Sequence, residues 1–416
     1  MAITMENVRL VVTTAVAEVQ AVDLHTHLMP STHGELLLWG PDSLLTYHYL
    51  VAELFMVAPM SLQPDEFYGW SLAKQADLIW AELFVKRSPI SEACRGALTC
   101  WQRLGLGAEL GARDLTAIRA WYSAQDPDEF CQKVMKLAGL RYAVMTNIPF
   151  DDGEAKWWDE GAEIPSYFRS ALRVDPLFAW AAASEKVAAA GFAKTFEGGK
   201  QYLRKWAKKM KPLYVMSSFP ADFSYPDAPA AAAGEYSAPA ILDNVILPLA
   251  EELGLPVALK VGTRRGANAA LGQAGDGVGV ADVASTMNLA RTYPNVKFLV
   301  TFLSRVNQHE ACVLSRKYRN VHLYGCWWFC NNPSIIDEMS RMRLEMLGTA
   351  VTLQHSDARI MDQLVYKWAH SREIIANVLV DKYSDVVRTG WKLTQAEVER
   401  DVYLLFGGAA EEFMAK

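Results

Sequence analysis

Short apolar runs recur along the chain, and longer segments with apolar residues at helical spacing separate most of them. The runs are rich in Val, Leu and aromatic residues and are continuous rather than alternating, which is typical of parallel strands buried on both faces. They predict eight strands, at 22–28, 142–148, 168–174, 213–219, 256–262, 297–303, 321–328 and 349–355. Eight strands that alternate with helices indicate an α/β protein with a (β/α)8 TIM-type barrel.

One interval is too long for this plan, because more than 110 residues lie between the first and second predicted strands. The surplus carries Leu, Ala, Trp and Phe at helical spacing. It predicts helices at 42–56, 63–70, 74–86 and 92–104, the last one capped by Ser91. We therefore expect residues 1–34 and 130–416 to form the barrel with its C-terminal helices. Residues 35–129 should form a mostly helical insertion over the barrel mouth.

Two further segments lie outside the strand pattern. The stretch 218–239, rich in Pro and Ala, predicts a long loop after the fourth strand. The tail from about residue 371 continues as helix, and Thr394 begins a Thr-Gln-Ala-Glu capping box that opens a helix at 396–406.

Composition and charge exclude several classes of protein. The 416 residues are 51% hydrophobic and 21% charged, which excludes a disordered chain. Six scattered Cys without a Cys-x-x-Cys pair exclude a small disulfide scaffold and indicate reduced thiols. No apolar run reaches the roughly 18 residues of a membrane span, and a net charge of −6 without a basic cluster argues against nucleic-acid binding. We expect a cytoplasmic protein that binds neither membrane nor nucleic acid.

The strongest chemical signal is the pair His25 and His27 at the end of the first predicted strand. Residues i and i+2 of a strand face the same side, so both imidazoles should point toward the barrel mouth. Asp357 follows the eighth predicted strand, which neighbours the first in a closed barrel. Two imidazoles and one carboxylate suit Zn²⁺ and related ions and leave coordination positions open. The alternative is a set of unrelated polar residues at strand ends, but the combination favours a metal site.

His48 and Tyr49 are adjacent polar residues in an apolar context at the start of the insertion. If the insertion covers the barrel mouth, either could act as a general acid or base. The alternative is that both are hydrogen-bonded residues of the core.

Basic and aromatic side chains at other strand ends are candidates for substrate contacts. They are Arg173, Arg305, Arg359, Trp327, Trp328 and His33. Several Arg at one barrel mouth predict an anionic substrate, which a guanidinium can bind through two hydrogen bonds. Strand alternation allows only one of the two Trp to face inward, and core packing is the alternative for this pair.

Strands five and six lack histidine, and Lys260 is the one ionisable residue in the middle of strands four to six. Binuclear metal hydrolases on this kind of barrel commonly use histidine at those positions. One metal ion is therefore expected, and whether Lys260 takes part in the site is left open.

Five motifs together resemble the uronate isomerases, also called glucuronate isomerases, of the amidohydrolase superfamily. They read D-L-H-T-H-L (23–28), L-L-T-Y-H-Y-L (44–50), A-L-R-V-D-P (171–176), G-C-W-W-F (325–329) and H-S-D-A-R (355–359). They occur in order from about residue 20 to the C-terminus. The Ser-Asp-Ala-Arg sequence is most similar to a divergent branch of the family known from bacilli, since other members have Thr-Asp-Ser-Arg.

The resemblance implies a distorted barrel and an aldose–ketose isomerase of carbohydrate metabolism. The hexuronate D-glucuronate would become D-fructuronate, or D-galacturonate would become D-tagaturonate, by proton transfer through a cis-enediol. It implies one divalent metal, expected to be Zn²⁺, on His25, His27 and Asp357. The catalytic residues would be Asp357, Tyr49 assisted by His48, and Arg359, and the family resemblance leaves open which of Asp357 and Tyr49 takes the C2 proton.

Two other functions remain as alternatives at this stage. One is a mononuclear metal-dependent hydrolase or decarboxylase that acts on a small carboxylic acid, and the other is a sugar-acid binding protein without activity. The Trp and Met residues of the insertion indicate a homo-oligomer, although they could instead pack on the barrel.

Overall fold

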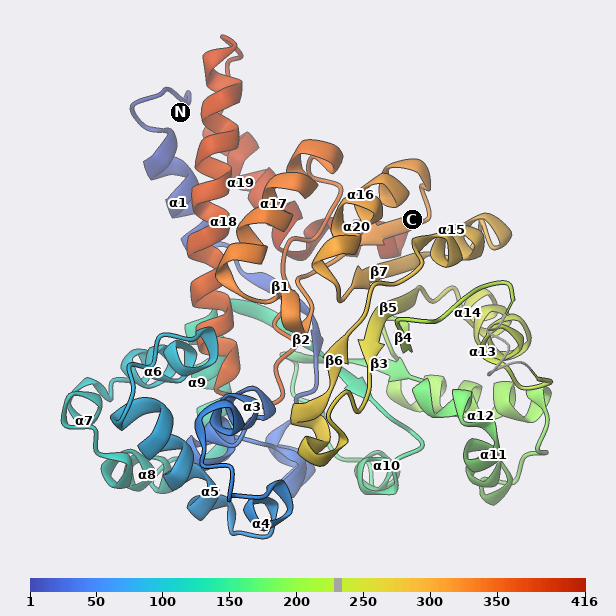
Figure 1. The fold of residues 1–416 in the computed structure, drawn as a ribbon. Helices are drawn as coiled ribbons and strands as arrows, with labels where there is room; N and C mark the ends of the chain where they lie inside the picture. The colour runs from blue at the N-terminus through green and yellow to red at the C-terminus, as the bar shows by residue number, and fades with distance from the viewer. Residues whose placement is uncertain (228–233) are drawn as a thin grey trace.

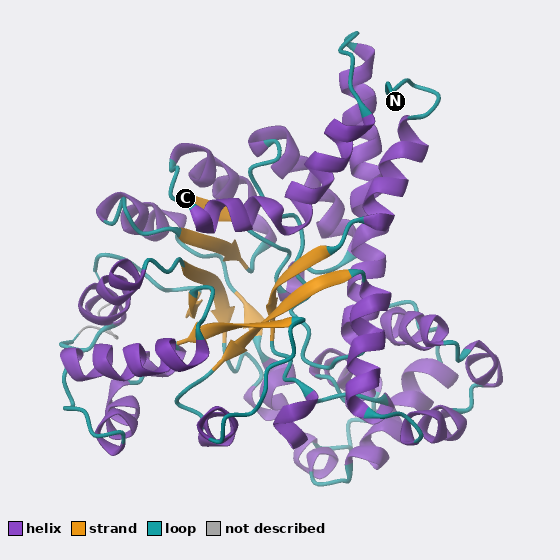
Figure 2. Cartoon of the chain, turned by 180° about the vertical axis from the view of Figure 1, so that it is seen from behind, coloured by secondary structure: helices purple, strands orange, loops and turns teal. Residues whose placement is uncertain are grey.

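A curled sheet of parallel strands lies at the centre of the computed structural model, which describes residues 1–227 and 234–416 (Figures 1 and 2). Its parallel strands are β1 (Ala21–Thr26), β2 (Leu140–Asn147), β3 (Phe168–Arg173), β4 (Val215–Pro220), β5 (Val257–Arg264), β7 (Phe298–Phe302) and β8 (Val321–Leu323). They pair in that order, and the short β6 (Gly277–Val278) pairs antiparallel with β5. Seven of the eight predicted strands are confirmed, and the distorted α/β barrel with them.

The prediction of an eighth strand at 349–355 is wrong. The described residues of this segment form one isolated bridge, between Thr352 and Tyr324, rather than a ladder. The side-chain oxygen of Gln354 accepts hydrogen bonds from the backbone N–H groups of Cys326 (3.3 Å) and His355 (3.1 Å). Thr352 makes two backbone hydrogen bonds across this bridge, its N–H to the Leu323 carbonyl oxygen (3.1 Å) and its carbonyl oxygen from the Gly325 N–H (2.9 Å), and among the described residues the ladder extends no further.

Backbone hydrogen bonds join this eighth segment to the end of β1. The Asp357 N–H donates to the His25 carbonyl oxygen (3.1 Å), and the His27 N–H donates to the Ala358 carbonyl oxygen (2.7 Å). Nearer the start of β1, the C-terminal segment η9 (Leu404–Gly408) contacts β1 and also accepts a hydrogen bond from the Leu353 N–H (3.1 Å). The barrel is therefore closed partly by the eighth segment and partly by the tail.

The inside of the barrel is divided into an apolar level and a polar level. The apolar level consists of Val22, Leu24, Tyr142, Val144, Ala171, Tyr214, Met216, Ala258, Leu299 and Tyr324, with Ala410 and Phe413 from α20 (Ala409–Ala415). Further along the strands, inward positions carry polar side chains, among them His27, Arg173, Ser218 and Lys260. This polar level lies at the carboxyl ends of the strands, where barrel enzymes have their active sites.

An irregularity in β1 determines that His25 faces this polar level. Asp23 pairs with Ala143 and Thr26 pairs with Met145, so three steps along β1 match two steps along β2. Leu24 belongs to the apolar level, and strict alternation would turn the next residue to the outer face of the sheet. The extra residue resets the alternation, as bulges beside active sites commonly do.

Helices surround the sheet, and the long α18 runs beside α1, α6, α9 and α17 (Figure 1). Outside the insertion they are α1 (Val8–Glu18), α10 (Asp152–Asp159), α11 (Trp180–Ala189), α12 (Phe196–Met210), α13 (Ala238–Ile241), α14 (Leu247–Leu253), α15 (Val283–Thr292), α16 (Gln308–Lys317), α17 (Pro333–Leu347), α18 (Gln363–Arg388) and α19 (Gln395–Tyr403). Within the described ranges, no helix has both the length and the apolar character needed to cross a membrane.

The segment between β1 and β2 is helical, and its helices gather on one side of the strands (Figure 1). They are α2 (Pro41–Leu45), α3 (His48–Val57), α4 (Pro64–Tyr68), α5 (Leu72–Ile79), η2 (Trp80–Val85), α6 (Glu92–Leu104), α7 (Gly107–Ala112), α8 (Leu115–Ser123) and α9 (Pro127–Ala138). The predicted helix 42–56 is two helices, because Tyr47 has an extended backbone (φ −60°, ψ 140°) and precedes α3.

The two predicted helix caps are confirmed. The Ser91 hydroxyl accepts a hydrogen bond from the Cys94 N–H (3.2 Å) at the start of α6. Thr394 forms a capping box with Glu397, and the helix that follows ends at Tyr403 rather than at residue 406. The predicted loop 218–239 begins inside β4 and ends at α13, and its residues 228–233 lie outside the described residues.

Candidate active site

The structure brings the three predicted metal ligands together at the barrel mouth. His25 Nε2 lies 2.9 Å from Asp357 Oδ1, and His27 Nε2 lies 3.5 Å from the same oxygen. One ligand atom from each residue lies within 4.8 Å of the other two. Asp357 has a left-handed backbone (φ 54°), which is strained for a residue with a side chain. The hydrogen bonds to β1 described above hold it there.

The donor set fits a divalent cation. His25 is fully buried, and within the described residues neither of its ring nitrogens has a hydrogen-bond partner, although Nε2 is so close to Asp357. Burial lowers the pKa of His25 to about 3 and holds the pKa of His27 well below its usual value, so both rings are neutral at pH 7. Neutral imidazole is the form that binds metals.

Lys260 is the nearest cation to this cluster. Its side chain is 1% exposed, and its Nζ lies 3.0 Å from Asp357 Oδ1 and 4.6 Å from the centre of the Trp327 ring. Burial lowers the pKa of Lys260 to about 7, although Asp357 opposes this shift. Burial also disfavours the charge of Asp357, but Lys260, His25 and His27 outweigh it and hold the pKa of that carboxyl well below its usual range.

A small pocket of about 30 Å³ lies above these residues and is rich in cations. It is lined by His27, Tyr47, His48, Arg173, Ser218, Lys260, Arg265, Gln273, Asp276, Trp327, Trp328, Asp357 and Arg359. Arg173 binds Asp175 (Nε–Oδ2 2.9 Å) and Arg265 binds Asp276. Arg359 donates to the Gln273 side chain (3.0 Å) and has no carboxylate partner among the described residues. The pocket therefore favours an anion.

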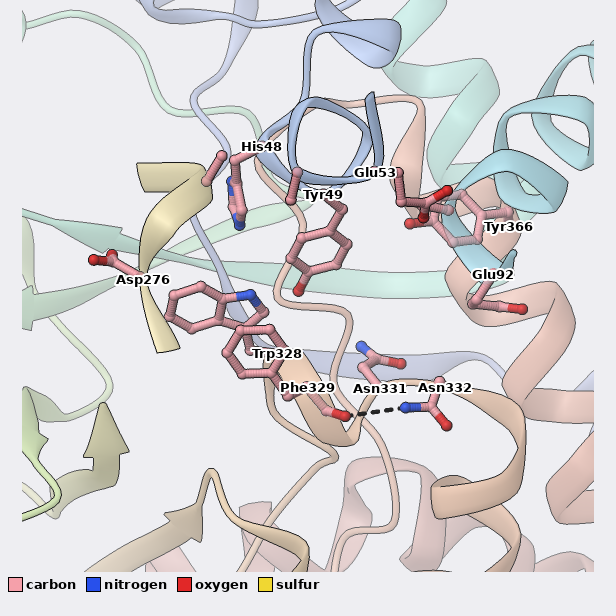
Figure 3. A pocket seen from close by; sticks show the side chains of 13 residues that line it. His48, Tyr49, Glu53, Glu92, Asp276, Trp328, Phe329, Asn331, Asn332 and Tyr366 are labelled. Carbon is pink, nitrogen blue, oxygen red and sulfur yellow. Dashed lines mark hydrogen bonds between the residues drawn. The ribbon is translucent and has the colours of Figure 1, made fainter. Parts of the chain in front are cut away.

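A larger cavity of about 230 Å³ adjoins this pocket and shares His48, Asp276 and Trp328 with it (Figure 3). Tyr49 points into it from α3, and the Glu53, Glu92 and Asn331 side chains lie around it (Figure 3). Burial holds the pKa of Tyr49 well above its usual value, so this hydroxyl is protonated at neutral pH. Among the described residues, neither the Tyr49 hydroxyl nor His48 Nε2 has a hydrogen-bond partner. Both are free to bind a ligand.

Both adjacent Trp line the small pocket, whereas the sequence allowed only one to face inward. β8 ends at Leu323, so Trp327 and Trp328 lie beyond the strand and its alternation does not apply to them. Gly325 permits the turn that follows β8 and precedes both Trp: its φ is +67°, and a Cβ there would lie 1.8 Å from the His355 ring.

Two predicted substrate residues lie outside this pocket. Arg305 is 63% exposed and forms a two-point ion pair with Glu338 on the surface (Nε–Oε2 2.7 Å). It lies in a 3-10 turn after β7 rather than on the strand, so its side chain leaves the mouth. His33 is buried in a side cluster, where its ring stacks on Trp157 at 6.0 Å between centroids.

Sequence reasoning missed several lining residues. Tyr47 belongs to the same motif as His48 and Tyr49 but was not singled out. Arg265, Gln273 and Asp276 come from the hairpin between β5 and β6, which folds over the mouth and contacts α3 and α4. The clustered Arg and Gly after β5 are the signal that could have indicated this loop.

The fold and the residues at the barrel mouth define the class of protein. This is a (β/α)8-type barrel protein whose mouth carries a cluster of two His and one Asp suited to one metal ion. A uronate isomerase from Bacillus halodurans C-125 is 44% identical, with 100% of this chain and 97% of that chain covered and a TM-score of 0.94. The chain belongs to the uronate isomerase family.

More distant structures share the fold. A uronate isomerase from Thermotoga maritima is 14% identical over 98% of this chain and 97% of its own (TM-score 0.76). A glucuronate isomerase from Caulobacter crescentus is 12% identical over 99% of this chain and 94% of its own (TM-score 0.77). Comparison with family models gives no match, and neither does comparison with curated proteins.

Proposed function

We propose that this enzyme is a uronate isomerase that interconverts D-glucuronate with D-fructuronate, D-galacturonate with D-tagaturonate, or both. The observation that carries the proposal is the full-length similarity to a uronate isomerase at 44% identity. The convergence of His48, Asp357 and Arg359 on one cation-rich pocket supports it.

The reaction moves a hydrogen between C2 and C1 and exchanges a carbonyl for a hydroxyl, so it needs a base and groups that handle the hydroxyl protons. In our proposal the Asp357 carboxylate, ionised at neutral pH, takes the C2 proton and returns it to C1. The protonated Tyr49 hydroxyl, with neutral His48 beside it, donates to the carbonyl oxygen and recovers the proton from the neighbouring hydroxyl. The Arg359 guanidinium stabilises the enediolate charge that develops between the two steps.

The same proposal assigns one divalent metal, expected to be Zn²⁺, to His25, His27 and Asp357. The metal would supply a positive charge that orients and polarises substrate oxygens. Support comes from the two neutral imidazoles and the unpartnered nitrogens of His25.

The anionic end of the sugar acid belongs in the cationic pocket in this proposal. Arg173 and Lys260 line that pocket, whereas Glu53 and Glu92 line the adjoining cavity. A carboxylate is attracted to the cationic pocket and repelled by the acidic side chains of the adjoining cavity. His48 lines both cavities, so the C1–C2 end is proposed to lie at their junction, between Asp357 of the cationic pocket and Tyr49 of the adjoining cavity.

The insertion 35–129 is proposed to cover the mouth, since it supplies His48 and Tyr49 to the two cavities. A homo-oligomer with a contact on the insertion is supported by the exposed Met56 and Met60, while Trp80 and Trp101 of the insertion are buried. A cytoplasmic location is part of the same proposal.

The test is incubation of the protein, with and without added Zn²⁺, with D-glucuronate and separately with D-galacturonate in D₂O. NMR should show ketose formation and deuterium at C2 of the recovered aldose for at least one sugar. Absence of both ketose and exchange with either sugar would reject the isomerase.

A further inference from the structure

Lys260 lies where it can influence a bound cation as well as a substrate. It follows Leu259 on β5, pairs in register with Ser218 of β4 and Thr301 of β7, and faces the barrel interior. Asp357 is its sole hydrogen-bond or ion-pair partner among the described residues. The Lys260 ammonium, His25 Nε2 and His27 Nε2 all approach the same oxygen, Oδ1, at 3.0, 2.9 and 3.5 Å.

The ligand set therefore has little negative charge to offer a cation. Two neutral imidazoles and one carboxylate carry a formal charge of −1, and the Lys260 amino group occupies the one carboxylate oxygen that both imidazoles approach. Ligating histidines usually donate their other N–H to a carboxylate or carbonyl oxygen, which strengthens them as ligands. Here His27 Nδ1 faces the Thr146 hydroxyl (3.2 Å) and the Arg173 guanidinium (3.5 Å). His25 Nδ1 has no partner among the described residues.

We propose that Lys260 is a positioning residue that weakens the affinity of the His25–His27–Asp357 site for a divalent cation and thereby keeps that ion exchangeable. The inference rests on the metal site of the proposed function and adds a specific determinant of its affinity. A cation bound at Asp357 Oδ1 has to share that oxygen with the Lys260 amino group 3.0 Å away, and positive charges at such a distance repel strongly in a buried site. Lys260 also holds the Asp357 carboxylate in place when no ion is bound.

The experiment measures Zn²⁺ affinity by competition with a chromophoric chelator, on the full chain at neutral pH. Lys260→Met and Lys260→Gln remove the charge, the second with a polar end that protects folding. Both should bind Zn²⁺ more tightly than the wild type, by a factor larger than the change in any control variant. Lys260→Arg keeps the charge and should stay within about threefold. The absorption spectrum of bound Co²⁺ should be the same in all, since the ligands do not change.

Two further variants serve as controls. One tests where the ion binds, and the other tests whether removing a different buried lysine changes the Zn²⁺ affinity. His27→Ala should abolish the Zn²⁺ affinity in the wild type and in Lys260→Met. Lys367 is also buried, but its Nζ donates to the Ser356 carbonyl oxygen (2.7 Å) rather than to the Asp357 carboxylate. Lys367→Met should therefore change the affinity less than about threefold.

The proposal is overturned if Lys260→Met and Lys260→Gln bind Zn²⁺ no more tightly than the wild type. It is also overturned if His27→Ala keeps the wild-type affinity, or if none of the proteins binds Zn²⁺. A Lys260 that contacts only substrate would raise the KM for the uronate in these variants and leave the Zn²⁺ affinity unchanged. The D₂O assay on the wild type tests the isomerase separately, so failure of one is distinct from failure of the other.

Discussion

Replacement of Asp357 by Asn is the sharpest test of the proposed chemistry. The side chain is isosteric and 5% exposed, and the amide retains an oxygen that can accept from Lys260, so the fold should persist. The amide is no longer a base, and general acid–base catalysis contributes about 10²–10⁴-fold. We expect kcat to fall by about this factor, which corresponds to roughly 3–5 kcal/mol of transition-state stabilisation.

Asp357→Asn should also lower the free energy of unfolding, and by an amount that depends on pH. It leaves Lys260 buried without its counter-charge, which costs up to about 3–5 kcal/mol for a group that stays charged. The pKa of Lys260 is lowered to about 7 in the folded enzyme, far below the value in an unfolded chain. The folded state therefore binds fewer protons, and loss of the proton relieves the penalty as pH rises. The loss of stability of Asp357→Asn relative to the wild type should therefore be larger at pH 6 than at pH 9.

The assays are kcat on the preferred uronate at saturating Zn²⁺, metal content, and thermal unfolding at both pH values. Asp362→Asn is the matched control, since Asp362 is also buried but binds the Tyr122 hydroxyl and the Gly40 N–H (2.9 Å). It should lower stability and keep kcat within about tenfold. A kcat for Asp357→Asn within tenfold of the wild type, with normal metal content, refutes the role of Asp357 as the base.

Three other outcomes are expected. Tyr49→Phe should lower kcat by about 10²-fold or more with little change in KM, whereas Tyr47→Phe should keep most of the activity; the reverse pattern in steady-state assays would move the role to Tyr47. Arg305→Ala should leave kcat and KM within about twofold, because its partner is a surface carboxylate, and a large rise in KM would contradict its placement. Burial raises the pKa of Glu154 to about 7, so the folded state binds more protons and stability falls as pH rises from about 4.5 through 7. Glu154→Gln should therefore raise the Tm at pH 8 and change it little at pH 4, and an equal shift at both would count against this.

The sequence was sufficient for features that depend on local pattern or on strand ends. Continuous apolar runs located the strands, and single polar residues located the caps at Ser91 and Thr394. His25, His27 and Asp357 could be placed together because parallel strands bring their carboxyl ends to one mouth.

Features that depend on one-residue shifts or on contacts across the barrel were not predictable. The apolar run at 349–355 resembles a strand, but among the described residues it forms one isolated bridge with Tyr324 and no ladder. Arg173 is the last residue of β3, whereas Arg305 lies in the turn after β7, which directs it to the surface. The contact of Lys260 with Asp357 joins segments that are 97 residues apart and reflects no local pattern.

The closure of the barrel has a consequence for how the chain acquires its site. His25 and His27 are made early in synthesis, but they remain incomplete until residue 357 arrives, more than 300 residues later. The start of β1 is covered by η9, which is made later still. Gly407 of η9 lies so close to Val22 that a Cβ on this glycine would be 2.6 Å from the Val22 side chain. Residues 404–408, which carry none of the proposed chemistry, therefore complete the wall beside β1, the strand that leads to these histidines. A nascent chain released before this segment would contain every proposed catalytic residue and still lack a closed barrel.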